Sequence, residues 1–523
     1  MNGAAGLTLV RFGSARDPLV LLERARPHPQ VQYLRCYLDD LGTRTFLIEA
    51  NYFDRDYLSE FEAFYATTSV GYPNVCRRVH AFSATVSRDL LERAVGGDPD
   101  ARSRLDEAYL GHIVLRPLPE APIGRTVLRT YQDPRASQGM PRIMNAARRY
   151  EAHVAGLTLA VHGLAWQQQD SAVGACATVA LWSMLHSSAF DDHHAIPTTA
   201  EITRASVPFA SSVGAAFPAN DGMHLEQVCD VIRSHGLTPV VIHGLDHVGF
   251  ERRTICPVIG SFLRSGYPIL AYCEFDDQES SAHAVCLVGF RSPALEEGAS
   301  DDLAVADANI EHVYIHDDNL GPNARFRVVD DAAGDGSPRI VLQADAPPPR
   351  TGQRPTTNPS ESYARLIPID LIVAVHPDLR TSPGSLQRAA IRAGEWLPAA
   401  LDLAAIATPG LVAHCVTVST RFIRLVDYLD RELGAALAGR RRALAAARLA
   451  LCERIPPMAR HVGVARFSVG ANPWMDVLYD TSDNDRHLRP RAHVVYQRQV
   501  NELFRLWGEF SERIDLGTRI RAW

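Results

Sequence analysis

The segment that most constrains the fold of this chain is an uncharged stretch that follows a cysteine. Residues 175–185 hold no charged residue, no glycine and no proline. A stretch of this length and composition is typical of a helix that is packed on most sides, so it belongs at the centre of a domain. A polar run that opens with Gln167, Gln168 and Gln169 precedes it. The sequence therefore predicts that Cys176 lies in the first turn of a buried helix.

A cysteine in this position has a distinct chemistry. Its thiol would lie at the positive end of the helix dipole, which favours the thiolate, the form that attacks carbonyl carbon. A side-chain amide from the glutamine run and the backbone N–H of Cys176 could then serve as the two donors of an oxyanion hole. Most single cysteines are small buried hydrophobic residues, however, so this interpretation depends on a base and an acid elsewhere.

Two later residues fit those roles. His283 lies at the start of an apolar segment, 282–290, and Asp317 lies near the end of the next one, 312–319. Both segments are short and bounded by turn signals, as buried strands are. If the two strands are neighbours, the carboxylate would fix the imidazole tautomer and stabilise the imidazolium. We therefore expect Cys176 as nucleophile, His283 as base and Asp317 as orienting acid, against the alternatives of a core thiol, a structural histidine and a turn aspartate.

A helix that bears the cysteine, followed by strands that bear the histidine and the aspartate, is the order of papain-like folds. The motifs concerned lie at residues 169–177, 222–237, 266–270, 283–290 and 313–317. With them, the segment from about 165 to 330 resembles the C39-like branch of papain-like cysteine peptidases. The resemblance implies an α+β fold, with a papain-like core in which the helix bearing the cysteine packs on an antiparallel sheet.

The resemblance also implies site residues. It gives Cys176, His283 and Asp317 the roles described above and makes Gln169 the oxyanion donor. Asp170 occupies the position where the family usually has its glutamine, so Gln168 stays open as the alternative donor. The family usually has proline after the aspartate, whereas this chain has Asp318, so Asp318 or Asn319 could be the third member instead.

The 523 residues suggest two to three domains. We expect an α/β region at 1–150, a catalytic region at 155–380 with a proline-rich insertion at 344–361, and a mostly helical region at 381–523. The resemblance covers neither flanking region. These regions would hold a substrate or a partner.

Composition excludes several classes of protein. The net charge of −7 argues against a nucleic-acid partner, and Arg440, Arg441 and Arg442 are best interpreted as a solvated helix face. The nine cysteines include no CxxC pair, which excludes a disulfide framework or a zinc finger. No apolar run is long enough to span a membrane, no secretory signal is evident, and no phosphate-binding glycine motif occurs. We expect a cytoplasmic protein without a cofactor.

Three further patterns have alternative interpretations. A metal site is a minor possibility at 191–194, which reads Asp-Asp-His-His, and a calcium site is a minor possibility at 317–319. Arg116 and Arg125 could bind an anion, but ion pairing is the more common role.

The sequence as a whole predicts a cysteine hydrolase that cleaves peptide or isopeptide bonds of a peptide or protein substrate through a thioester. Acyl transfer or deamidation by the same three residues is one alternative. The other alternative is a binding or scaffold protein that keeps the fold without using the thiol.

Overall fold

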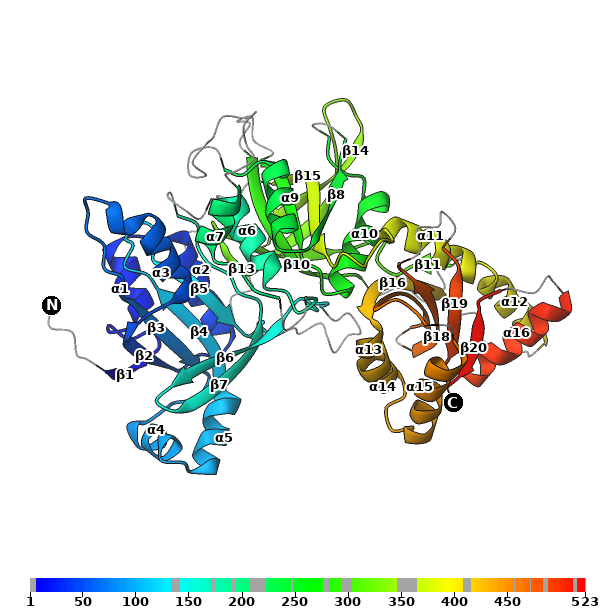
Figure 1. Ribbon diagram of the computed structural model, residues 1–523, viewed down its shortest axis with the longest axis horizontal. Coiled ribbons are helices and arrows are strands. Elements are labelled where there is room, and N and C mark those ends of the chain that lie inside the picture. Colours follow the sequence, from blue (N-terminus) through cyan, green and yellow to red (C-terminus); the bar gives the residue numbers. More distant parts are fainter. Residues whose placement is uncertain are drawn as a thin grey trace.

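The computed structural model contains three sheets of five, seven and six strands, with helices between and around them (Figure 1). The α+β fold is therefore confirmed. No helix of the described part of the chain is long and apolar enough to cross a membrane. The structure describes residues 6–132, 142–170, 175–190, 194–206, 222–245, 248–275, 282–293, 303–345, 365–407, 415–455, 457–470, 472–482, 488–510 and 515–522.

The N-terminal sheet is an antiparallel meander with helices in its connections. Its strands, in spatial order, are β1 (Leu7–Arg11), β2 (Thr45–Tyr52), β3 (Cys76–Phe82), β4 (Tyr109–Leu115) and β5 (Ile123–Leu128). Its helices are α1 (Pro18–Ala25), α2 (Pro29–Asp40), α3 (Arg55–Ala63), α4 (Arg88–Val95) and α5 (Pro99–Ala108). Polar side chains start these helices: the Ser87 hydroxyl, for example, accepts the N–H of Leu90 in the first turn of α4.

A hairpin leads from this sheet towards the cysteine. It consists of β6 (Arg148–Val154) and β7 (Leu157–Gly163). After β7 the chain runs beside β5, where Trp166 and Thr126 exchange two backbone hydrogen bonds of 2.7 and 3.0 Å. The backbone N–H of Gln168 then donates to Ile123 at 3.1 Å. The segment that precedes Cys176 is therefore attached to the edge of the N-terminal sheet.

The central sheet has the strand order β14-β13-β12-β10-β9-β15-β8, and all pairs of neighbouring strands in it are antiparallel. The strands are β8 (Thr238–His243), β9 (Ile269–Phe275), β10 (Ala282–Arg291), β12 (His312–Asp317), β13 (Gly321–Ala332), β14 (Pro338–Ala344) and β15 (Leu366–Val375). Helix α6 (Cys176–Leu185) packs on β9 and β10, and the other helices of this region are α7 (Thr199–Ser206), α9 (Leu225–Ser234) and α10 (Arg252–Arg264). The expected pairing of the strand of His283 with that of Asp317 is confirmed, since β10 pairs with β12.

The C-terminal region also forms a sheet, in the order β11-β16-β17-β18-β19-β20. The strands are β11 (Ala304–Val305), β16 (Val416–Arg424), β17 (His461–Val469), β18 (Asn472–Asp480), β19 (Pro490–Val495) and β20 (Thr518–Arg521). The helices are α11 (Pro383–Gly394), α12 (Leu397–Ala407), α13 (Leu425–Asp427), a π-helical turn (Tyr428–Glu432), α14 (Leu433–Ala436), α15 (Arg441–Arg454) and α16 (Arg498–Phe510).

Residues 381–523 hold more helix than strand, as expected, but five strands of this region also form a sheet that the description as mostly helical does not include. Buried charge hides the strand pattern: Arg466 in β17 makes an ion pair of 2.8 Å with Asp476 in β18, and Arg421 in β16 pairs with Glu432 at 2.6 Å. Charged residues inside strands break the apolar–polar alternation by which strands are recognised.

The arginines at the start of α15 are exposed, as expected for a solvated helix face.

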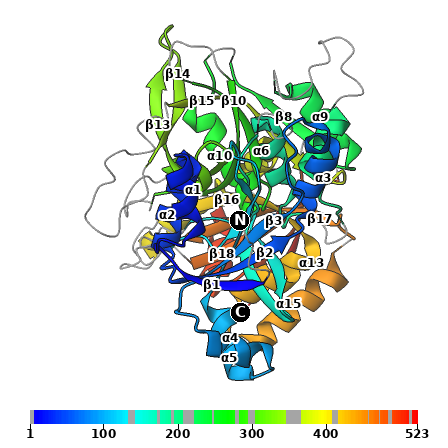
Figure 2. The same ribbon diagram turned by 90° about the vertical axis from the view of Figure 1, so that its left-hand side faces the viewer.

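Helix α2 joins the N-terminal sheet to the central one. It lies beside β13, as Figure 2 shows from the N-terminal side of the molecule. The hydroxyl of Tyr33 donates to the backbone of Pro322 at 2.9 Å, and the amide of Gln30 donates to the backbone of Asp318 at 3.2 Å. A Cβ atom at Gly321 would overlap the Tyr33 ring, so this close approach requires glycine. The N-terminal region thus supports the turn that follows β12.

Candidate active site

Cys176 is the first residue of helix α6, and the nine residues that follow it in the helix are all buried. The residue before the helix, Ala175, offers no side-chain cap. The first N–H groups of α6 therefore have no capping side chain, and they point towards the region of the thiol. Cys176 itself is partly exposed, so a reactant can reach its sulfur.

His283 lies at the second position of β10, with its ring 5.7 Å from the Phe275 ring and nearly parallel to it at 16°. The residue is buried, with 3% of its surface exposed. Burial alone would lower the pKa of His283, but the charge and hydrogen bond of Asp317 and a hydrogen bond with Cys176 hold it well above 6.5. The imidazolium form is thereby favoured beside the thiol.

Asp317 is the carboxylate that contacts this ring directly. Its Oδ1 atom lies 3.2 Å from Nε2 of His283 and also accepts the backbone N–H of Asn319 at 2.9 Å. The indole N–H of Trp166 donates to the backbone oxygen of Asp317 at 3.0 Å, which further fixes the residue. Because Nε2 is engaged, Nδ1 is the ring nitrogen left for the proton of Cys176.

Asp318 is a second buried carboxyl beside the same ring, with its Oδ1 atom 3.6 Å from Nε2 of His283. Burial raises the pKa of Asp318 to about 7; the charge of His283 opposes this shift and that of Asp317 adds to it. Below neutral pH Asp318 is therefore mainly uncharged. Geometry and charge both make Asp317 the better partner of the imidazolium.

The side chains of the glutamine run make their hydrogen bonds to residues other than Cys176. The side-chain amide of Gln169 donates to Oδ1 of Asn319 at 2.6 Å, and Gln169 does not belong to the described residues that line the cavity at Cys176. The side chain of Gln168 is buried and accepts the backbone N–H of Ile123 at 3.2 Å. Gln169 therefore links the segment before Cys176 to the loop after Asp317, while Gln168 links that segment to β5.

A buried ion-pair cluster holds the same segment from the other side. Arg116 lies 3.2 Å from Glu60 on α3 and 3.6 Å from Asp170. Glu60 also accepts the hydroxyl of Thr199, on α7, at 2.6 Å. The expected ion-pairing role of Arg116 is thus confirmed, as is that of Arg125, which pairs with two aspartates at 2.8 and 3.4 Å. No local pattern in the sequence indicated these pairings, because their members lie far apart in the chain.

The thiol and the imidazole line one cavity of about 350 Å³. Met223, Tyr272 and Ile369 provide apolar wall, while His224, Glu274 and Asp370 provide polar groups. None of these six residues was predicted, since they come from separate segments of the central region.

Metal binding gains little support at the positions that the sequence suggested. Asp191, Asp192 and His193 lie outside the described residues. His283, Asp317 and Asp318 are close enough together to share an ion. Oδ1 of Asp317 is engaged by His283 and Asn319, whereas its Oδ2 atom and both carboxyl oxygens of Asp318 are buried without a hydrogen-bond partner. A histidine is a poor calcium ligand, so calcium is not favoured here. Comparison with known proteins finds no family model that matches the chain and no curated protein that is similar to it.

Proposed function

We propose that the protein is a cysteine hydrolase with a papain-like core that cleaves peptide or isopeptide bonds. The observation that carries this proposal is the line of contacts from Cys176 through His283 to Asp317, at the wall of a cavity. A thiol at a helix N-terminus beside a histidine whose pKa is raised forms a thiolate–imidazolium pair.

The reaction follows from these positions. The proton of Cys176 passes to His283, and the thiolate attacks the carbonyl carbon of the substrate. The open N–H groups at the start of α6 stabilise the resulting oxyanion. The imidazolium gives its proton to the leaving amine as the C–N bond breaks, which leaves a thioester. His283 then takes a proton from water, which attacks the thioester and regenerates the thiol as a carboxylic acid leaves.

The test is the rate of Cys176 alkylation as a function of pH, read by peptide mass spectrometry. The exposed Cys452 serves as an internal standard in the same sample. We expect the Cys176 rate to reach a plateau well below the free-thiol pKa of about 8.5. His283→Ala should abolish that plateau, whereas His153→Ala, which removes an exposed histidine, should leave it unchanged.

A rate that rises only near the free-thiol pKa in both wild type and His283→Ala would refute the proposal and favour a scaffold protein. If the plateau is present, the acyl-enzyme can be trapped and offered water or an added amine. Preference for the amine would assign the same three residues to acyl transfer instead of hydrolysis.

A further inference from the structure

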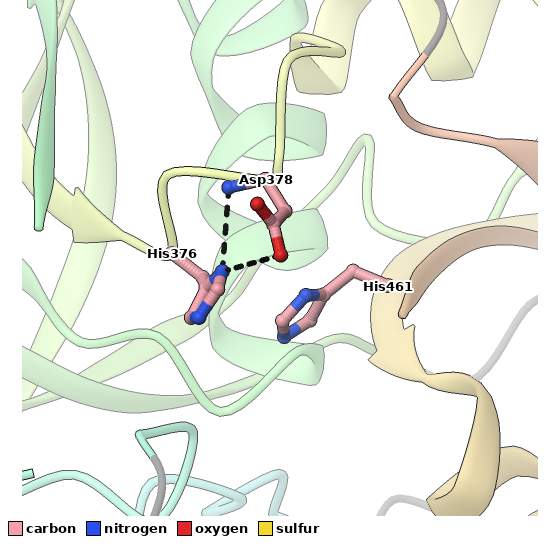
Figure 3. Close-up of side chains that lie close together, drawn as sticks. All are labelled: His376, Asp378 and His461. Carbon is pink, nitrogen blue, oxygen red and sulfur yellow. Dashed lines mark hydrogen bonds and ion pairs between the residues drawn. The ribbon is translucent and has the colours of Figure 1, made fainter. Parts of the chain in front are cut away.

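A second group of chemically capable side chains lies where the central and C-terminal sheets meet. His376 directly follows β15, Asp378 comes two residues later, and His461 opens β17. Figure 3 shows the three side chains pointing towards one another from two separate segments. They take no part in the active site described above.

The distances in this group suit a metal ion. Nδ1 of His376 and Oδ2 of Asp378 are 3.4 Å apart, and one ligand atom from each of the three residues lies within 4.8 Å of the others. Two atoms bound at 2.0–2.1 Å to a tetrahedral metal are separated by about 3.3 Å. The backbone N–H of Asp378 donates to Nδ1 of His376 at 3.3 Å, so an ion bound at that nitrogen would replace this hydrogen bond.

An independent observation concerns His461. Only 3% of its surface is exposed, and its Nδ1 atom is buried without a hydrogen-bond partner. A buried atom of this kind has the capacity to bind a ligand or a water molecule. The centroids of the two imidazole rings lie 4.7 Å apart, with the ring planes inclined at 34°. An ion between the two rings would satisfy Nδ1 of His461.

The donor set selects the class of ion. Two imidazoles and one carboxylate suit first-row transition metals, whereas calcium and magnesium require mostly oxygen ligands. Arg424 and Arg460 carry positive charge close to His461 and would disfavour an ion held by charge alone. The two imidazole nitrogens would therefore have to bind the cation together with the Asp378 carboxylate.

We propose that His376, Asp378 and His461 bind one divalent transition-metal ion, with Zn²⁺ as the preferred ion. The ion would cross-link the segment after β15 to the start of β17, and so fix the central sheet against the C-terminal sheet. A fourth position stays open to water, because the Asp378 side chain is 56% exposed. His461 also lines a polar cavity of about 530 Å³.

The experiment measures zinc stoichiometry and affinity in full-length protein after removal of metals with a chelator. A Cys176→Ser background removes the thiol as a competing ligand. We expect one Zn²⁺ per chain, and the loss of that ion in His376→Ala and in His461→Ala. Asp378→Asn, at an exposed position that should not disturb folding, is expected to weaken binding by about tenfold or more. His153→Ala, an exposed histidine elsewhere, is the matched control.

Cobalt(II) in place of zinc identifies the ligands. Weak d–d absorption without a sulfur-to-metal charge-transfer band would support a nitrogen and oxygen site. At the same zinc concentration, zinc should raise the unfolding temperature of the parent more than that of Asp378→Asn. Three results would each refute the proposal: no zinc bound by the parent protein, full affinity in Asp378→Asn, or a charge-transfer band that assigns the ion to a cysteine.

Discussion

The choice of Asp317 over Asp318 as the acid that orients His283 leads to a sharp comparison between two variants. Asp317→Asn keeps the shape of the side chain and removes its charge, 3.2 Å from Nε2 of His283. An opposite charge at such a distance shifts a pKa by about 1–3 units, and each unit corresponds to a tenfold change in the protonation equilibrium. The pKa of His283 should fall by that amount. The thiolate–imidazolium pair should become less stable by about 10- to 1000-fold.

Asp318→Asn should have a much smaller effect at acidic pH. Because the pKa of Asp318 is raised to about 7, roughly one molecule in ten carries that charge at pH 6. Removal of the charge should therefore slow alkylation of Cys176 less than about threefold at pH 6. At pH 8, where Asp318 is mainly ionised, the effect of this variant should grow.

The assay is the alkylation rate of Cys176 at pH 6 and pH 8, with the exposed Cys452 as standard in each sample. Near-normal reactivity in Asp317→Asn together with a large loss in Asp318→Asn would reverse the assignment of the acid. Small effects in both variants would show that neither carboxylate stabilises the imidazolium, and the reasoning from charge and distance would fail.

Two further predictions concern the scaffold of the site. Arg116→Met should lower the unfolding midpoint in urea, because loss of one partner of a buried ion pair costs about 3–5 kcal/mol, whereas Arg104→Met, at an exposed position, should not. The loss of stability should be larger at pH 8 than at pH 5. The pKa of Glu60 is already raised to about 7 from 4.5, and it rises further without Arg116. A carboxyl group with a raised pKa in the folded state makes the protein less stable as the pH increases, because the buried group must then ionise. Equal losses at both pH values would contradict this account. Gly321→Ala should cost about 1–3 kcal/mol through overlap with the tyrosine ring packed on it, whereas Gly334→Ala, which meets no atom within 4 Å, should be neutral in the same urea titration.

The parts of the site that the sequence predicted are those with a local signal. Cys176 was found from the uncharged helix that follows it, and His283 and Asp317 from the apolar strands on which they lie. The pairing of β10 with β12 then brought the last two together. Each of these inferences needed only a segment of about ten residues and its periodicity.

The parts that were missed depend on contacts between distant segments. Nothing near Arg116 in the sequence indicates that Glu60 and Asp170 will surround it, and nothing near His376 indicates that His461 will face it. Strands β16 and β17 in the C-terminal region were missed for a related reason, whereas residues 475–480 of β18 were predicted as a strand. Arg466 in β17 reads as a solvated residue until Asp476, on the neighbouring strand, is seen to neutralise it. Periodicity reports burial of single residues and cannot report such pairs.

These long-range contacts change how the flanking regions are understood. The segment that leads to Cys176 is held by β5 and by Arg116, while the turn that carries Asp318 is held by Gln30 on α2. Both ends of the candidate active site therefore depend on the N-terminal sheet, although the sequence placed that sheet in a separate region of unknown role. Separation of the central region from it would expose Glu60, Arg116 and Trp166 and would release the backbone around Cys176 and Asp317. The unit that positions the thiol and its acid is therefore the N-terminal and central sheets together.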